Sequence, residues 1–240
     1  KHDIPTDKVQ NMLWEAQHKA FNRLPLGQQR WLMKHLTGQC GVGHTLMKRK
    51  YQDHDNCPLC NKPDETTAHV ILCRDRRART KLTVLLQAFD EWMTETNTLP
   101  TLQQAILQRL HAWRHRQTSK IVKGSRALRK AVKEQDALGW ENFFNGRPSK
   151  LFAELQHKHY QEIGLQFHGH SWLSKTISQL YDISWGMWEH QNEIKHNTTT
   201  PKQKELLTQL RLQVEHQFLL GTPGLPATDH YLLEVKEDIF

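Results

Sequence analysis

The sequence predicts an all-α protein in which short helices pack as an irregular bundle. Apolar residues recur at three- and four-residue spacing through most of the 240 residues, and no paired segments show the alternation typical of half-buried strands. Hydrophobic residues make up 37% of the chain and it holds 8 Trp, so it can bury a core. This composition excludes a wholly disordered protein.

The first half predicts five helices separated by glycine, proline and polar turns. The longest follows Thr66, whose side chain can cap the first turn, and it bends near residues 74–80. Pro100 suits the first turn of the fifth helix because that position needs no amide hydrogen. The five segments run from Thr6 or Asp7 to Arg23, through Trp31 to Leu36, from Leu46, from Thr66 to Phe89, and from Thr98–Thr101 through Trp113.

The second half predicts further helices of the same kind. Ser125 caps one that ends at the turn 145–148, and Pro148 or Ser149 opens the next. A long helix after Gly169 carries an apolar stripe and a neighbouring aromatic stripe, which are typical of a core. The expected segments run from Ser125 through Trp140, from Ser149 through Tyr160, from Leu173 through Ile194, from Thr200-Pro201 through Phe218, and over a short helical tail.

Composition divides the chain into three regions. These are a helical region at 1–97, a basic helical segment at 98–147 and a helical C-terminal region at 148–240. Net charge is +6 over residues 1–80, +5 over 81–147 and −3 over 148–240, which favours a polyanionic partner for the front of the chain. Uneven surface charge on a soluble protein is the alternative.

Three cysteines and a histidine follow the spacing C-x2-C-x8-H-x3-C. A two-residue gap in a tight turn lets two thiolates face one point, and residues four apart on a helix share a face. Three sulfurs and one imidazole nitrogen complete the tetrahedral shell of Zn²⁺ and leave no position for water. We therefore predict a structural zinc knuckle over residues 53–75, near the N-terminal third, with the ligands Cys57, Cys60, His69 and Cys73.

Two other interpretations of this cluster are three free thiols beside an unrelated histidine, and an iron–sulfur cluster, which the histidine ligand disfavours. Cys40, His44 and His54 lie nearby in the sequence and are expected to be bystanders, the cysteine buried and the histidines on the surface. His168-Gly169-His170 leaves a weak second metal site open.

The segment around the cluster resembles a known family. Thr37-Gly38, Leu46, Cys57-Pro58, Cys60, Glu65-Thr66, His69-Val70 and Cys73 match the C-terminal zinc-knuckle region of reverse transcriptases from non-LTR (LINE-like) retrotransposons. The match covers about residues 28–75. A second resemblance, to the helical tails of diatom-type retroelement proteins, rests on Gly139-Trp140, Gly146-Arg147 and Met187 to Asn197. The resemblance implies a piece C-terminal to the polymerase that handles RNA or DNA template.

Catalytic signatures of that family are missing from the chain. The polymerase site needs an adjacent Asp pair, and no Asp-Asp occurs. A nuclease of related elements needs P-D and E-x-K, which Pro63-Asp64 with Glu234-Val235-Lys236 or Glu193-Ile194-Lys195 supply formally. Asp64 lies between zinc ligands and Glu193 in a predicted helix, whereas that nuclease carries its acids on a sheet. We therefore expect no enzyme activity in this chain.

Three basic clusters bracket the knuckle or follow it, and they can contact phosphates with low sequence selectivity. From Arg109 to Lys133 there are nine basic side chains and no acidic one. Trp113 lies in this run, either as a core residue or as a stacking surface for a base. The predicted nucleic-acid contacts are Lys48, Arg49 and Lys50; Arg74, Arg76, Arg77, Arg79 and Lys81; and Arg114, Arg116, Lys120, Lys123, Arg126, Arg129 and Lys130.

Two functions therefore stay open. One is a zinc-stabilised module that binds RNA or DNA. The other is an all-α scaffold that docks on other domains of the same polyprotein. Both agree with a start at Lys1, which predicts release from a longer polypeptide. Mean hydropathy is −0.73 and no apolar run approaches the roughly 20 residues of a membrane span, so we expect an intracellular protein, nuclear or cytoplasmic.

Overall fold

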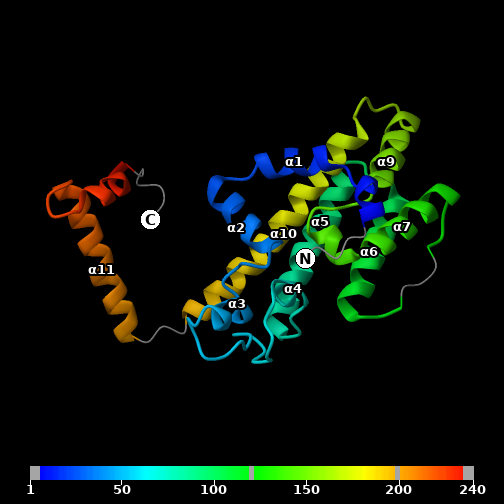
Figure 1. Ribbon diagram of the computed structural model, residues 1–240. Helices are drawn as coiled ribbons and strands as arrows, with labels where there is room; N and C mark the ends of the chain where they lie inside the picture. Colours follow the sequence, from blue (N-terminus) through cyan, green and yellow to red (C-terminus); the bar gives the residue numbers. More distant parts are fainter. Residues whose placement is uncertain (1–5, 119–121, 198–200, 235–240) are drawn as a thin grey trace. The chain divides into compact units, whose positions relative to one another are not determined.

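The computed structural model describes residues 6–118, 122–197 and 201–234, and it confirms the all-α class (Figure 1). Over these residues strand-like pairing is limited to one isolated bridge between Met12 and Ser149. A 3₁₀ helix, η1 (Thr6–Asn11), precedes the α-helices, and another, η2 (Ala227–Glu234), follows them. The α-helices are α1 (Trp14–Asn22), α2 (Leu26–Leu36), α3 (Gly43–Lys48), α4 (Thr67–Leu72), α5 (Arg76–Glu95), α6 (Pro100–His115), α7 (Arg126–Leu138), α8 (Trp140–Phe144), α9 (Lys150–Glu162), α10 (Gly169–Asn197) and α11 (Pro201–Leu220).

Three segments predicted as single helices are divided. The first splits into η1 and α1. The helix expected from Thr66 to Phe89 breaks after Leu72, because Asp75 is extended and its side chain accepts from the Arg77 amide to cap α5. The helix expected through Trp140 breaks at Gly139, which has a φ of +91°. The predicted bend near residues 74–80 is thus a complete interruption just after the last Cys.

Three predicted helix caps are present, whereas α1 begins after Leu13, which makes no side-chain cap, and not at Thr6 or Asp7. Thr66 accepts from the His69 amide, Ser125 from the Leu128 amide and Ser149 from the Leu151 amide. Pro100 occupies the first turn of α6. The predicted cap at Thr200 lies outside the described residues.

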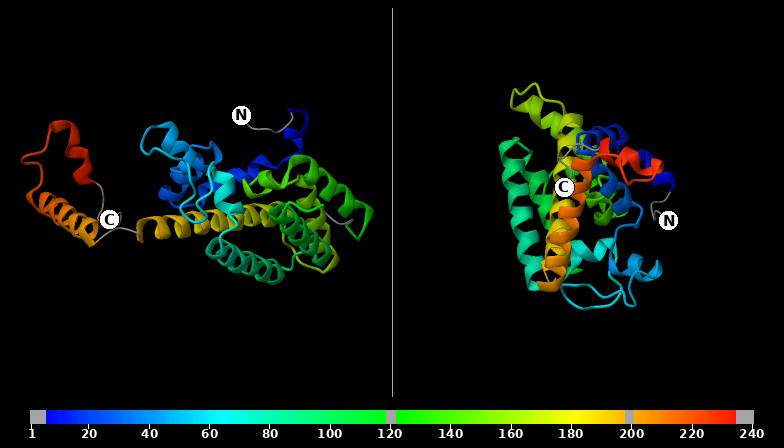
Figure 2. Two further views of the ribbon diagram at one scale, coloured as in Figure 1. Left: turned by 90° about the horizontal axis from the view of Figure 1, so that it is seen from below. Right: turned by 90° about the vertical axis from the view of Figure 1, so that its left-hand side faces the viewer.

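The chain forms two compact units, Lys1–Lys195 and His196–Phe240. This division differs in position from the boundaries predicted at residues 97 and 147. In the first unit α10 runs between α1 and α2 on one side and α5 on the other (Figures 1 and 2). Trp31 of α2 packs edge-on against Trp185 of α10, with ring centroids 5.0 Å apart. The predicted stripes of α10 therefore face the core.

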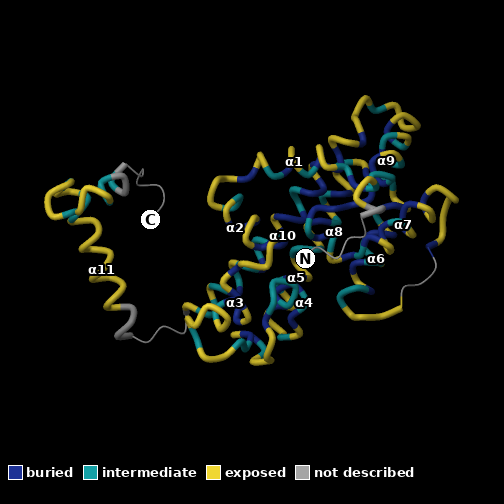
Figure 3. Tube along the Cα trace, viewed as in Figure 1, coloured by how far each residue is buried: buried dark blue, intermediate teal, exposed yellow. Residues whose placement is uncertain are grey.

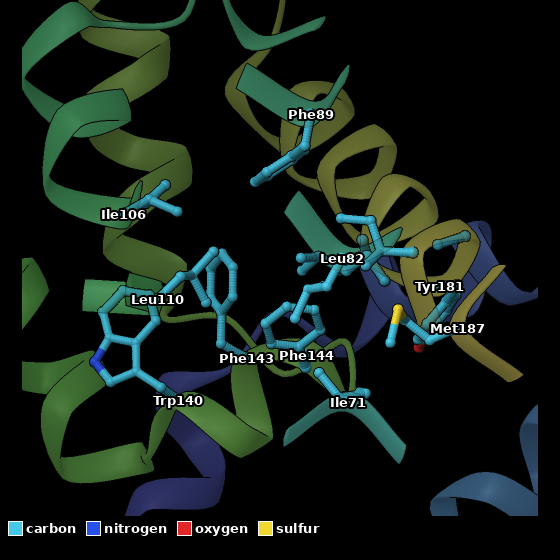
Figure 4. Packing of buried hydrophobic residues seen from close by; sticks show 14 of the residues in the cluster. Ile71, Leu82, Phe89, Ile106, Leu110, Trp140, Phe143, Phe144, Tyr181 and Met187 are labelled. Atoms are coloured by element: carbon cyan, nitrogen blue, oxygen red, sulfur yellow. The ribbon is translucent and has the colours of Figure 1, made fainter. Parts of the chain in front are cut away.

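Aromatic side chains fill the core of the first unit (Figure 4). Phe143 is fully buried and packs against Phe152 with ring centroids 6.2 Å apart. Gly146 has a φ of +73°, and a Cβ there would collide with the Tyr181 hydroxyl, so this turn needs glycine. Trp113 is half-buried and stacks on Phe144 with ring centroids 5.2 Å apart, so it packs against the core.

The second unit consists of α11 and η2. Along α11 the apolar side chains are largely exposed (Figure 3). The exposed leucines are Leu206, Leu207, Leu210, Leu212, Leu219 and Leu220. The described part of the chain has no helix that is both long and apolar enough to span a membrane.

Candidate metal centre and basic surface

The four predicted ligands meet at one point. Their three sulfurs and the histidine nitrogen all lie within 4.8 Å of one another. Cys57 Sγ is 3.8 Å from Cys73 Sγ, and Cys60 Sγ is 3.3 Å from His69 Nε2. Tetrahedral sulfur ligands at about 2.3 Å from a metal ion stand about 3.8 Å apart. The donor atoms therefore already have nearly the spacing of a four-coordinate shell.

A tight turn presents the first two ligands. The Cys57 amide donates to the Lys62 carbonyl, and the Asn61 amide donates to the Cys57 carbonyl, each at 2.9 Å. Asn61 takes a φ of +54°, which asparagine tolerates better than most residues. The backbone amides of Cys60 and Leu59 oppose the rise in the pKa of Cys57 that the hydrogen bond with Cys73 and burial cause. Nearby amides favour the thiolate form that binds a metal.

Helix α4 presents the other two ligands, and the start of α5 is tied to the turn that carries the first two. His69 lies in the first turn of α4, where the Thr66 cap holds its amide, and Cys73 ends the helix. Arg77 donates from Nη2 to the Leu59 carbonyl at 3.2 Å and from Nε to Asp75 at 3.0 Å. The first turn of α5 is thus tied to the turn that carries Cys57 and Cys60.

A buried carboxylate connects this loop to the rest of the first unit. Glu65 is 1% exposed and accepts from the Gly43 amide at 2.6 Å and from Gln191 Nε2 at 2.7 Å. The Glu65 amide also donates to the Asp55 carbonyl at 3.0 Å. A Cβ at Gly43 would lie 2.5 Å from that same carbonyl oxygen, so only glycine fits. Glu65 therefore joins α3 and α10 to residues 53–68, the loop beside the candidate ligands, which we call the metal loop.

Crowding of the donor atoms shifts their pKa values in opposite directions. The hydrogen bond with Cys73, together with burial, raises the pKa of the Cys57 thiol to about 12. The same hydrogen bond lowers the pKa of Cys73. A hydrogen bond with Cys57 raises the pKa of His69 against the opposing effect of burial. A metal ion would replace the protons that these atoms share, so binding releases protons.

The predicted bystanders are placed as expected. Cys40 is buried, and burial raises the pKa of its thiol to about 12, while His44 and His54 are exposed. His44 Nδ1 lies 3.3 Å from Asp64 Oδ1, and with Asp55 these groups form a second set of close donors. Because two of its three members are exposed, this set resembles an ordinary surface ion pair.

Histidines also gather away from the cysteines. The ring centroid of His168 lies 4.5 Å from that of His157 and 4.9 Å from that of His170. The weak site left open at His168 and His170 thus gains a third histidine. Their ligand atoms are not among the converging donor groups of the described residues, so the rings are neighbours without a chelating arrangement.

Two basic clusters that are distant in sequence come together beside the metal ligands. A hollow of about 280 Å³ is lined by Leu72, Cys73, Arg74, Arg79, Arg114, His115 and Gln117. A second hollow, of about 390 Å³, lies against Cys60 and His69 and includes Lys62, Arg74, Arg114 and Arg116 together with one acidic residue, Asp64. Helix α6 ends at His115, and the left-handed φ of +52° at the next residue, Arg116, turns the chain here.

The remaining predicted contacts line neither hollow. Arg77 is bound to Leu59 and Asp75, and Lys81 is half-buried. Lys120 lies outside the described residues. The other members are exposed to solvent: Lys48, Arg49, Lys50, Arg76, Lys123, Arg126, Arg129 and Lys130.

Sequence reasoning missed two residues of this region. Lys62 lines the second hollow, and its place between the ligands was the available signal. Glu65 was noted only as part of a matching motif. Its partners Gly43 and Gln191 lie 22 and 126 residues away, so no local pattern indicates them.

The fold and the site define a class: an all-α protein with a Cys₃His cluster that can hold a metal ion. Comparison of the chain with family models, with curated proteins and with solved structures finds no match. The function is therefore argued from the site itself.

Proposed function

We propose that the chain is a non-catalytic helical module that a structural zinc ion stabilises and that binds RNA or DNA through its backbone phosphates. The observation that carries the proposal is the meeting of unpaired arginines from two distant segments beside the Cys₃His cluster. The metal organises the loop, and the cations around it supply the binding surface.

Zinc is the metal that the donor set favours. Three thiolates and one imidazole are soft or borderline ligands, which disfavour magnesium and calcium. All four ligand positions come from the protein, so the ion would be structural rather than catalytic. An iron–sulfur cluster normally takes four thiolates, and the fourth donor here is His69.

Nucleic acid is favoured as partner by the sign and placement of the charges. Arg74, Arg79, Arg114 and Arg116 have no ion pair with a carboxylate in the described part of the chain, so their charge is available to an anion. Further cations are exposed on α3 and α7. Binding through phosphates predicts weak dependence on base sequence.

The retroelement context rests on the resemblance of residues 28–75 to knuckles that follow a reverse transcriptase polymerase. In that context the chain would handle template beside a polymerase located elsewhere in the parent polyprotein, and it would also contact other parts of that polyprotein.

Two measurements test the proposal. Native mass spectrometry of untreated protein should show one tightly held zinc ion per chain. Filter binding with labelled RNA and DNA at rising salt should show affinity falling linearly on a double logarithmic plot, by about 0.7 per phosphate contact for single strands. A folded protein without a tightly held metal, or without retention of either nucleic acid at low salt, would refute the respective part.

A protein-interaction scaffold is the second candidate. The observation that favours it is the row of exposed leucines on α11. It would be preferred if the metal is present and nucleic acid is not retained.

A further inference from the structure

The smaller basic hollow has an unusual lining for a protein surface. Its charged groups are Arg74, Arg79 and Arg114, with His115 and Gln117 as further polar groups and no acidic residue. They come from three places: the residue after the last Cys ligand, the first turn of α5 and the end of α6. Three arginines line the hollow without a carboxylate, so the hollow is electropositive and attracts an anion.

Arg114 is held at this position rather than extended into water. Its Nη2 donates to the Arg79 carbonyl at 3.2 Å, which fixes the guanidinium group across the space between α6 and α5. Burial and the neighbouring Arg79 charge lower the pKa of Arg114. The Arg114 guanidinium group is therefore partly removed from water and lies near another cation. An anion bound between Arg79 and Arg114 would offset the cost of this burial and of the repulsion between the two cations.

The size of the hollow limits the ligand. Its volume of about 280 Å³ is far above the roughly 10–15 Å³ that a cavity needs to hold one water molecule. A phosphate group therefore fits with part of its hydration shell. Guanidinium groups suit phosphate because their paired N–H donors match two phosphate oxygens.

We propose that the hollow lined by Arg74, Arg79 and Arg114 is a phosphate-binding site that holds one phosphate group of the bound nucleic acid. This inference rests on the proposed function and locates its main contact. Arg74 directly follows Cys73, so the metal cluster fixes one wall of the site, and α6 supplies the opposite wall.

A charge-matched pair of double variants tests the site in the full chain. R79Q/R114Q removes two charges from the hollow. R30Q/K158Q removes two charges from exposed positions on α2 and α9 that line neither hollow. Both proteins must keep the wild-type helical circular dichroism and one metal ion per chain before they are compared.

Binding of a 12-nucleotide fluorescent strand, with and without a 5′-phosphate, is measured by anisotropy at several salt concentrations. We expect R79Q/R114Q to lose about tenfold or more in affinity and about 0.7 from the salt slope, whereas R30Q/K158Q changes affinity by about twofold at most. An effect seen only with the 5′-phosphorylated strand would assign the site to a terminal phosphate. An equal effect on both strands would assign it to a backbone phosphodiester.

The outcomes separate the two proposals. If wild type binds the strands and the two double variants weaken binding equally, the hollow is not the site, while nucleic-acid binding stands. If wild type binds neither strand, the proposed function fails. A titration with inorganic phosphate at constant ionic strength then decides about the hollow alone. The Arg114 Nε–Hε NMR signal should shift, and the Arg30 signal should not. Equal or absent shifts would overturn the site.

Discussion

The metal loop and the helical core of the first unit are held together in different ways. Residues 53–68 contain few apolar side chains, and the loop relies on four donor atoms, the Glu65 carboxylate and backbone hydrogen bonds. The core from α5 to α10 relies on close packing of aromatic and aliphatic side chains such as Phe89, Phe143 and Leu173.

This difference shows which kind of perturbation each region should resist. Packing among many side chains loses a fraction of its free energy when one of them is truncated. A four-coordinate metal site depends on every ligand, because the ion binds only a complete shell tightly. The loop should therefore fail as a whole when one ligand is lost, and the core should weaken by degrees.

Loss of one thiolate should produce the largest effect. Cys57 and Cys40 are both buried, and only Cys57 belongs to the converging donor group. We expect Cys57→Ser to lose tight metal binding, which contributes on the order of 10 kcal/mol in small zinc domains, and to lose hydrogen-exchange protection over residues 53–75. The helices of the core should keep their circular dichroism.

Cys40→Ser is the matched control for this experiment. It makes the same chemical change at a buried site and should keep one metal ion per chain by native mass spectrometry. Equal metal content in Cys57→Ser and Cys40→Ser would contradict the assignment of the ligands.

Truncation in the core should have the second-largest effect. Phe143 is fully buried at the centre of the aromatic cluster, so Phe143→Ala should lower the free energy of unfolding by about 3–5 kcal/mol in urea titrations. Phe167 is 60% exposed, and Phe167→Ala should cost far less. Metal content should stay at wild-type level in both variants. Coupled loss of the metal in Phe143→Ala would show that the two regions are one cooperative unit.

Local patterns predicted the Cys₃His cluster and much of the helix content, because both depend on residues that are close in the sequence. Ligand spacing, the Ser125 cap and Pro100 in a first turn act within a few residues, so the sequence displays them directly. The break at Asp75 was expected only as a bend, because the cap of α5 competes with continued helix at the same residues.

Features that depend on tertiary packing could not be predicted in this way. The basic clusters at Arg74–Lys81 and after Arg109 were recognised as charge runs, and their meeting across α5 and α6 follows from how the two helices pack. Likewise, apolar spacing on α11 predicts a helix correctly, and it gives no information about whether a neighbour covers the leucines.

Acid should weaken the core through His35. This side chain is buried on α2 and stacks on Trp31, and burial lowers its pKa from 6.5 to about 4. The unfolded chain binds the proton more readily than the folded protein does. The contribution of neutral His35 to the free energy of unfolding is therefore complete above pH 6.5 and is lost as the pH falls toward 4. The full pKa shift corresponds to a loss of about 3 kcal/mol in the free energy of unfolding.

The comparison is made between wild type and His35→Gln by urea unfolding at pH 7 and pH 4.5. A metal chelator is present throughout, so that release of the ion does not contribute. His18→Gln, at an exposed position on α1, should keep the wild-type pH dependence. The same loss of stability in His35→Gln as in wild type would place the acid sensitivity in another group.

Glu65 is where the two regions meet, and its variant should show the smallest of these effects. Glu65→Gln keeps the shape of the side chain but removes its charge and replaces one acceptor oxygen with an NH₂ group. Gln191 can turn its amide so that Oε1, which has no hydrogen-bond partner in the described part of the chain, accepts from this NH₂ group. The expected loss is the difference between charge-assisted and neutral hydrogen bonds, about 1 kcal/mol. Asp64→Asn makes the same change at the neighbouring, exposed position and should leave the unfolding free energy close to that of wild type.

Metal affinity shows whether Glu65 links the metal loop to α10 or is only a buried acid. If Glu65 transmits order from α10 to the loop, Glu65→Gln should also weaken metal affinity several-fold in a chelator competition, because the residues between Cys60 and His69 lose their attachment. Lower stability with unchanged metal affinity would mean that the four ligands organise the loop without help from the core. In that case the two regions would be independent, although a buried carboxylate binds both of them.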